Sequence, residues 1–76
     1  MRKDKAYLQD IRQAILDIER FIKGINQDEF YKNKEKQYAV LRALEIIGEA
    51  TKNLSRELKL KYSEVPWKDI AVCAIN

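Results

Sequence analysis

The 76-residue chain has no histidine, a single cysteine, a single proline and only two glycines. Without histidine it cannot carry a Ser-His-Asp triad, a Cys-His pair or the usual zinc sites, and a nuclease that depends on an imidazole is excluded. Two glycines are too few for a phosphate-binding loop or a dinucleotide fingerprint. The sequence therefore predicts no metal site and no cofactor.

The chain also lacks the features of exported and membrane proteins. One cysteine cannot form an intrachain disulfide, which suits a reducing compartment. No apolar run approaches the roughly 20 residues that cross a bilayer, and the charged start of the sequence leads into no signal-peptide core. These absences predict a cytoplasmic protein without a membrane partner.

Charged residues, by contrast, are abundant: 15 Lys and Arg against 12 Asp and Glu give a net charge of +3. A chain of this length forms one small domain, residues 1–76. Ordering costs about 1.5 kcal/mol per residue, whereas burying one large apolar side chain returns only about 1.5–3 kcal/mol. Because the balance is marginal, we expect the chain to associate with itself or with a partner.

Apolar residues at steps of three and four predict a first helix over about residues 4–23. Asp4 is its expected N-cap, and Gly24 is its expected end because glycine readily adopts the left-handed conformation that terminates helices. Tyr7 and Ala14 lie beside the predicted core stripe. That stripe consists of Leu8, Ile11, Ile15, Ile18, Phe21, Ile22 and Ile25.

A second long helix is predicted over about residues 34–60, antiparallel to the first because the connection is short. Asn26 and Glu29 form a capping-box pattern that predicts a helical turn in this connection, and Asn33 is placed to cap the long helix. Ala43 and Ala50 flank its apolar stripe. The stripe consists of Val40, Leu44, Ile47, Thr51, Leu54 and Leu58.

The last segment predicts a short helix. Residues 61–65 read as a loop, and Pro66 suits the first turn of the helix that follows. The apolar run from Ile70 to Ile75 meets no glycine, basic residue or later proline that would end a helix. We therefore predict an all-α fold of two long antiparallel helices plus a short, incomplete C-terminal helix, and we interpret the chain as truncated or frameshifted.

Charged residues on the second long helix form the candidate site. Glu49 projects almost opposite the apolar stripe, beside Glu45 and Arg42. The simpler interpretation is a solvated surface; the functional one is the charged lining of a cleft between subunits. Glu45 and Glu49 repel each other mildly at this spacing, and two carboxylates are a weak signal for a metal. Gly48 costs about 1 kcal/mol relative to alanine in a helix, which favours a close approach between helices.

The remaining polar and thiol features favour no single function. Basic residues cluster at 2–5, 32–36 and 59–61, where they are more typical of solvated helix ends than of a nucleic-acid site. The charge of +3 permits contact with RNA phosphates without requiring it. Cys73 lies in an apolar run and is expected to be an inert buried thiol.

One pair of motifs resembles a known family. Ile47-Gly48-Glu49-Ala50, followed by Pro66-Trp67, is similar to the signature of the HepT-like branch of the HEPN domains. The resemblance covers nearly the whole chain and implies a helical bundle that forms a homodimer. We assign structural signature roles to Ile47, Gly48, Glu49, Ala50, Pro66 and Trp67 on this basis.

The resemblance also implies a function and a partner. HepT-like proteins are metal-independent RNase toxins, and each is paired with a minimal nucleotidyltransferase antitoxin that modifies a tyrosine. Their catalytic signature, an arginine followed by a histidine and a tyrosine, begins on the helix opened by Pro-Trp. Here Ala74 stands where the arginine is expected, and histidine is absent. No catalytic residue is therefore transferred to this chain.

Three interpretations follow from the sequence. The preferred one is a HepT-like ribonuclease domain that is itself catalytically inactive. The second is a non-catalytic helical module that binds an antitoxin or a full-length paralogue. The third is a basic helical protein that binds RNA weakly.

Overall fold

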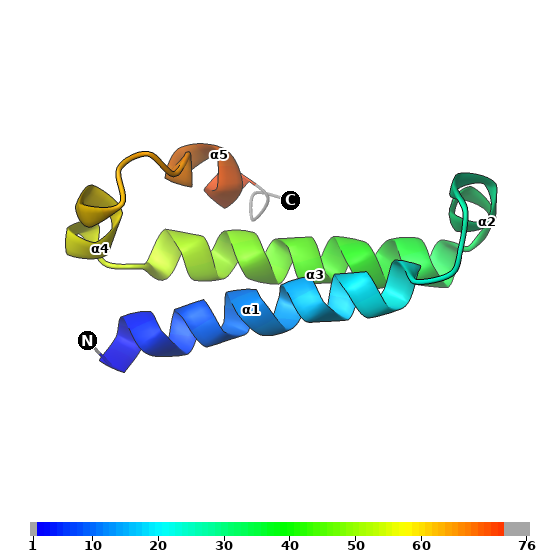
Figure 1. The fold of residues 1–76 in the computed structure, drawn as a ribbon, viewed down its shortest axis with the longest axis horizontal. Helices are drawn as coiled ribbons and strands as arrows, with labels where there is room; N and C mark the ends of the chain where they lie inside the picture. Colours follow the sequence, from blue (N-terminus) through cyan, green and yellow to red (C-terminus); the bar gives the residue numbers. More distant parts are fainter. Residues whose placement is uncertain (1, 73–76) are drawn as a thin grey trace.

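A computed structural model describes residues 2–72 and places five helices in that range. Their bounds are α1 (Arg2–Ile22), α2 (Gln27–Lys32), α3 (Lys34–Asn53), α4 (Arg56–Lys61) and α5 (Trp67–Ala71). Helices α1 and α3 run antiparallel and side by side, with α2 at one end and α4 at the other, and α5 turns back over α3 (Figure 1). The predicted all-α fold with two long antiparallel helices is confirmed.

The connection between α1 and α3 is fixed by local capping, as the sequence predicts. Gly24 ends α1 with a φ of +78°. The Asn26 side chain accepts a hydrogen bond from the Glu29 backbone at 2.8 Å, and the Glu29 carboxylate accepts one from the Asn26 backbone at 3.1 Å. Asn33 caps α3 by accepting from the Lys36 backbone at 3.0 Å. These bonds satisfy backbone donors that helix starts leave without partners.

The contact between α1 and α3 is built from small side chains. Among the described residues, the buried hydrophobic side chains are Ala14, Ala43, Ala50 and Leu54. Thr51 is also buried, and its hydroxyl donates to the Ile47 carbonyl at 2.7 Å. Because interaxial distance depends on the side chains at the contact, three alanines allow α1 and α3 to approach closely.

This contact corrects the predicted core. The alanines that we placed beside the stripes occupy the interface, whereas Leu8, Ile15 and Ile22 are 41%, 46% and 43% exposed. Leu44 of α3 is 38% exposed as well. Periodicity identified the apolar half of each helix, but the rotation of the helices brings the smallest residues of that half together.

The second long helix is shorter than predicted. Helix α3 ends at Asn53, and Leu54 is extended, with φ −65° and ψ 145°. Ser55 then caps the separate helix α4 by accepting a hydrogen bond from the Leu58 backbone at 3.1 Å. The prediction of one helix over residues 34–60 is therefore wrong, because the spacing of Leu54 and Leu58 continues the apolar pattern across the break.

Asp4 also differs from its predicted role. Helix α1 begins at Arg2, so Asp4 lies inside the first turn and is not the N-cap. Its carboxylate is buried and accepts hydrogen bonds from the Ser55 backbone at 2.7 Å and from the Ser55 hydroxyl at 2.6 Å. These two bonds hold the pKa of Asp4 below its ordinary value. Asp4 thus ties the start of α1 to the break between α3 and α4.

Trp67 joins α4 to α5. Pro66 occupies the N-cap position of α5 and Trp67 is its first residue, close to the predicted start. The indole N–H donates to the carbonyls of Lys59 at 3.1 Å and Tyr62 at 3.0 Å. Lys61 belongs to α4, so the connecting loop begins one residue later than predicted. The expectations for Cys73, Ala74 and Ile75 lie outside the described residues.

No helix in the range 2–72 has both the length and the apolar character needed to cross a membrane.

Candidate functional site

The first candidate site is a small cavity between α1 and α3. Arg42 and Glu49 of α3 line it together with Tyr7 and Asp10 of α1, and its volume is about 150 Å³. Both α3 residues were predicted as cleft-lining residues, and the structure places them at one cavity. The contribution of Tyr7 and Asp10 was missed, since it depends on how α1 is rotated against α3.

The third predicted residue, Glu45, is not among the residues that line this cavity. Its carboxylate lies 3.9 Å from the Arg42 guanidinium, in an i,i+3 ion pair. Arg42 therefore offsets part of the repulsion between Glu45 and Glu49. Glu49 itself is exposed, and its backbone carbonyl accepts a hydrogen bond from the Asn53 amide at 2.9 Å. A cleft between subunits at these residues stays a prediction.

The Ile-Gly-Glu-Ala signature has mainly structural contacts. Gly48 and Ala50 are two of the four buried residues of α3. Ile47 is half-buried and its carbonyl accepts the Thr51 hydroxyl. Glu49 is thus the one member of the signature that is exposed to solvent and able to take part in polar contacts.

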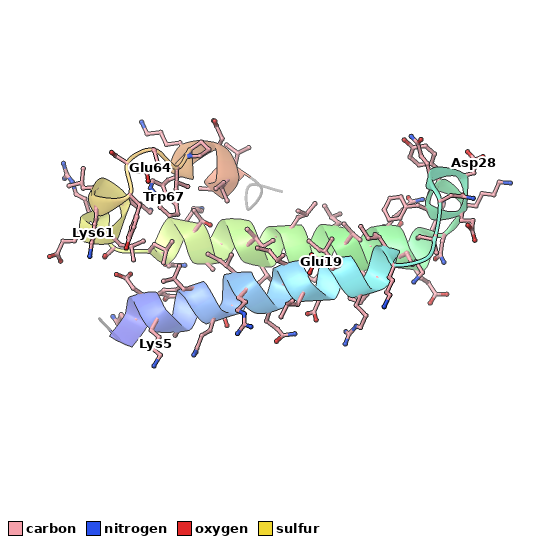
Figure 2. The ribbon with its side chains drawn as sticks, viewed as in Figure 1. Lys5, Glu19, Asp28, Lys61, Glu64 and Trp67 are labelled. Carbon is pink, nitrogen blue, oxygen red and sulfur yellow. The ribbon has the colours of Figure 1, made fainter. Side chains whose placement is uncertain are left out.

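A second and larger pocket lies where α3, α4 and α5 meet; we refer to it as the junction pocket. Its volume is about 760 Å³. Figure 2 shows Trp67 between α4 and α5, beside the end of α3. The charged residues that line it are Lys52, Arg56, Lys59, Lys68 and Asp69. Sequence reasoning missed this pocket, because the four cations come from three helices and are not neighbours in sequence.

Neither candidate site resembles a metal centre. Within residues 2–72, no three His, Cys, Asp or Glu side chains lie close enough together to hold a metal ion. The cavity at Arg42 holds two carboxylates, from Asp10 and Glu49, and one cation. The junction pocket is instead dominated by positive charge, which favours an anionic ligand.

The comparison with known proteins agrees with the signature and the fold. The family described as "Ribonuclease HepT-like" matches residues 11–73. The chain belongs to this family. It is 47% identical over 70 residues to the "Probable ribonuclease HepT" of Thermococcus cleftensis, with 92% of this chain and 64% of that protein covered.

Two further relatives show the same extent of similarity to this HepT-like chain. One, from Methanocaldococcus jannaschii and named "Putative RNase", is 45% identical over 91% of this chain and 63% of its own length. Another, from Caldanaerobacter subterraneus and also named "Putative RNase", is 44% identical over 93% of this chain and 63% of its own length. The chain thus spans somewhat less than two thirds of each of these relatives. No solved structure matches it.

Proposed function

We propose that this chain is the helical scaffold of a HepT-like ribonuclease, that it works through association with another chain, and that its 76 residues alone do not cleave RNA. The observation that carries the proposal is that small side chains are buried between the helices while large apolar side chains are exposed. The buried hydrophobic side chains in the described range are three alanines and one leucine, while larger aliphatic side chains of the same helices remain exposed. A two-helix hairpin of this kind needs a further surface to bury its large apolar side chains.

Five of the exposed aliphatic residues, from α1 and α3, form what we call the open face: Leu8, Ile15, Ile22, Leu41 and Leu44. The three α1 members are seven residues apart, so they lie along one line of the helix. Aliphatic side chains in a line can pack against the same line of a second copy, as a two-fold symmetric interface requires. We therefore propose a homodimer, as the family resemblance implies.

Light scattering coupled to size-exclusion chromatography tests this association. We expect the native chain to have the mass of a dimer and Ile15→Lys to have the mass of a monomer, because a buried lysine in the interface lacks a partner charge. Leu60→Lys is the matched control, since Leu60 is 66% exposed and lies on α4, outside the open face. A monomeric native chain, or equal effects of the two variants, would contradict the dimer.

The proposed lack of RNA cleavage rests on the chemistry of the side chains. General acid–base catalysis needs a group with a pKa near neutrality, and the chain has no histidine to supply one. The position that the family resemblance gives to a catalytic arginine is Ala74. Purified chain incubated with mixed RNA is expected to leave it intact. Cleavage that disappears in Arg42→Ala or Glu49→Gln would overturn the proposal and place a different active site at the α1–α3 cavity.

The toxin–antitoxin pairing implied by the resemblance forms part of the same proposal. Its support is family membership together with the exposed apolar surface, which offers a partner an area to bury. Co-expression with a nucleotidyltransferase encoded next to the gene tests it. A complex that survives purification supports the pairing, and a chain that elutes without the nucleotidyltransferase contradicts it.

A further inference from the structure

The junction pocket is lined by both positively charged and apolar side chains. Lys52 comes from the last turn of α3, Arg56 and Lys59 from α4, and Lys68 from α5, whereas Asp69 is the single carboxylate in the lining. Four cations against one anion around a common space give a locally positive field. The volume of about 760 Å³ lies in the range of roughly 300–1,000 Å³ that is typical of ligand sites.

Three of these cations are available to a ligand. The side chains of Lys52, Arg56 and Lys68 are exposed. The ion pairs found within residues 2–72 join Arg20 to Asp17 and Arg42 to Glu45, so none of them uses a pocket cation. Lys59 is different, because its ammonium lies 3.5 Å from the Lys52 carbonyl. It contributes charge to the pocket while it interacts with the end of α3.

The lining of the pocket also contains apolar residues. These are Trp67, Leu60, Val65 and Pro66. The two hydrogen bonds from the Trp67 indole to backbone carbonyls fix the orientation of its ring. The ring is half-buried, so part of its surface remains open to a ligand.

The geometry points to the junction pocket as a binding subsite for single-stranded RNA, in which Lys52, Arg56 and Lys68 contact phosphates and the Trp67 ring contacts a base. Proteins that bind single strands without sequence preference combine a positive groove with aromatic side chains in this way. An acidic peptide could pair with the cations, but it has no base to stack on the Trp67 ring. The inference rests on the proposed function for the choice of RNA as the substrate class.

Trp67 makes the binding directly observable, because it is the only tryptophan in the sequence. We would titrate an oligouridine of about ten nucleotides, within the site sizes of single-strand-binding domains, and record tryptophan fluorescence. The expected result is a saturable change in emission. A poly-glutamate peptide of equal charge should produce no such change at the same concentration.

A matched pair of variants locates the contacts. The pocket variant combines Lys52→Gln, Arg56→Gln and Lys68→Gln. The control variant combines Lys23→Gln, Lys32→Gln and Lys34→Gln, which removes the same charge from exposed positions at the other end of the molecule. Each phosphate contact to a single strand contributes about 0.7 to the slope of log K against log salt. We expect the slope of the pocket variant to be smaller in magnitude by about 2, and its affinity for oligouridine to be about tenfold weaker or worse. The control variant should keep the native slope and the native affinity.

Three outcomes would overturn the inference. Equal losses in the two variants would show that RNA responds to the charge of the whole molecule. Binding by fluorescence anisotropy of a labelled oligouridine, without a change in Trp67 emission, would place the RNA elsewhere. Equal affinity for poly-glutamate would make the pocket a site for an acidic protein segment. The mass and RNA-cleavage measurements test the proposed function separately, so a failure here leaves that proposal to its own tests.

Discussion

The α1–α3 hairpin and the α4–α5 junction are stabilised by different interactions. In the hairpin, Ala14, Ala43 and Ala50 are buried between two long helices. At the junction, the Trp67 indole donates to two backbone carbonyls, and the Ser55 hydroxyl accepts from the Leu58 backbone N–H and caps α4. The hairpin should therefore respond to side-chain volume, and the junction to the removal of single donors and acceptors. The comparison teaches that one small chain can use close packing at one place and capping at another.

The largest expected effect comes from enlarging a residue in the hairpin. Ala43 is 5% exposed, so Ala43→Leu forces extra volume between α1 and α3. Overpacking of this kind destabilises by about 1–3 kcal/mol, measured as the free energy of unfolding in urea by circular dichroism. Leu60→Ala is the control, and at a surface position we expect a change of less than about 0.5 kcal/mol. Equal free energies for the two variants would show that the hairpin is not closely packed.

Trp67→Phe is expected to rank second and to act on the junction. It keeps an aromatic ring but removes the N–H that two carbonyls accept, at a cost of about 1–2 kcal/mol. Hydrogen exchange should accelerate at backbone amides of α4 and α5 while those of α1 and α3 remain protected. Tyr38→Phe, at an exposed position of α3, should change neither the stability nor the exchange rates of these amides. Faster exchange throughout the hairpin would show that the Trp67 hydrogen bonds stabilise more than the junction.

Ser55→Ala tests the link between the regions. The variant removes the N-cap of α4 and one of the two hydrogen bonds to Asp4. Loss of a serine cap costs about 1 kcal/mol, and thermal unfolding followed by circular dichroism measures it. Ser63→Ala, at an exposed loop position, serves as the control. A smaller loss for Ser55→Ala than for Ser63→Ala would refute the capping role.

The smallest effect is expected from Asp4 and depends on pH. Hydrogen bonds from Ser55 lower the pKa of Asp4 in the folded chain. The carboxylate therefore contributes stability that is present above about pH 4, the pKa range of an unfolded aspartate, and is lost as the pH falls through the lower folded value. Asp4→Asn should remove this loss of stability as the pH falls below about 4, measured as the free energy of unfolding in urea at each pH. Glu19→Gln, at an exposed position of the same helix outside both candidate sites, should retain the native dependence of stability on pH.

Local signals in the sequence were sufficient to predict the structure of the connection between the long helices. Gly24, Asn26 and Asn33 act where their own conformational and hydrogen-bonding preferences place them, so the predicted caps agree with the structure. The break at Leu54 was missed although Ser55 is a typical N-cap residue, because the apolar spacing continued through it. The partner of Ser55 is Asp4, which lies 51 residues away in sequence. No local pattern could have indicated that contact.

In the candidate sites too, the sequence predicted neighbours within one helix but not contacts between helices. Arg42 and Glu49 share a helix, so their proximity follows from the helical repeat, whereas Tyr7 and Asp10 join them only through the rotation of α1. The junction pocket depends on the turn between α4 and α5, which brings Lys68 toward Lys52 and Arg56. Sequence neighbours such as Lys59 and Lys61 suggested basic clusters, but only Lys59 of this pair lines the pocket.

The bond between Asp4 and Ser55 also constrains how the chain can be made on a ribosome. Helix α1 is complete at Ile22, yet the alanines and the serine that it meets follow at Ala43, Ala50 and Ser55. At translation rates of about 5–20 residues per second, the first helix waits roughly two to seven seconds for its counterpart. During that interval its aliphatic side is accessible to chaperones and to other nascent chains. Slower elongation over residues 23–55 would lengthen this exposure and increase the risk of aggregation.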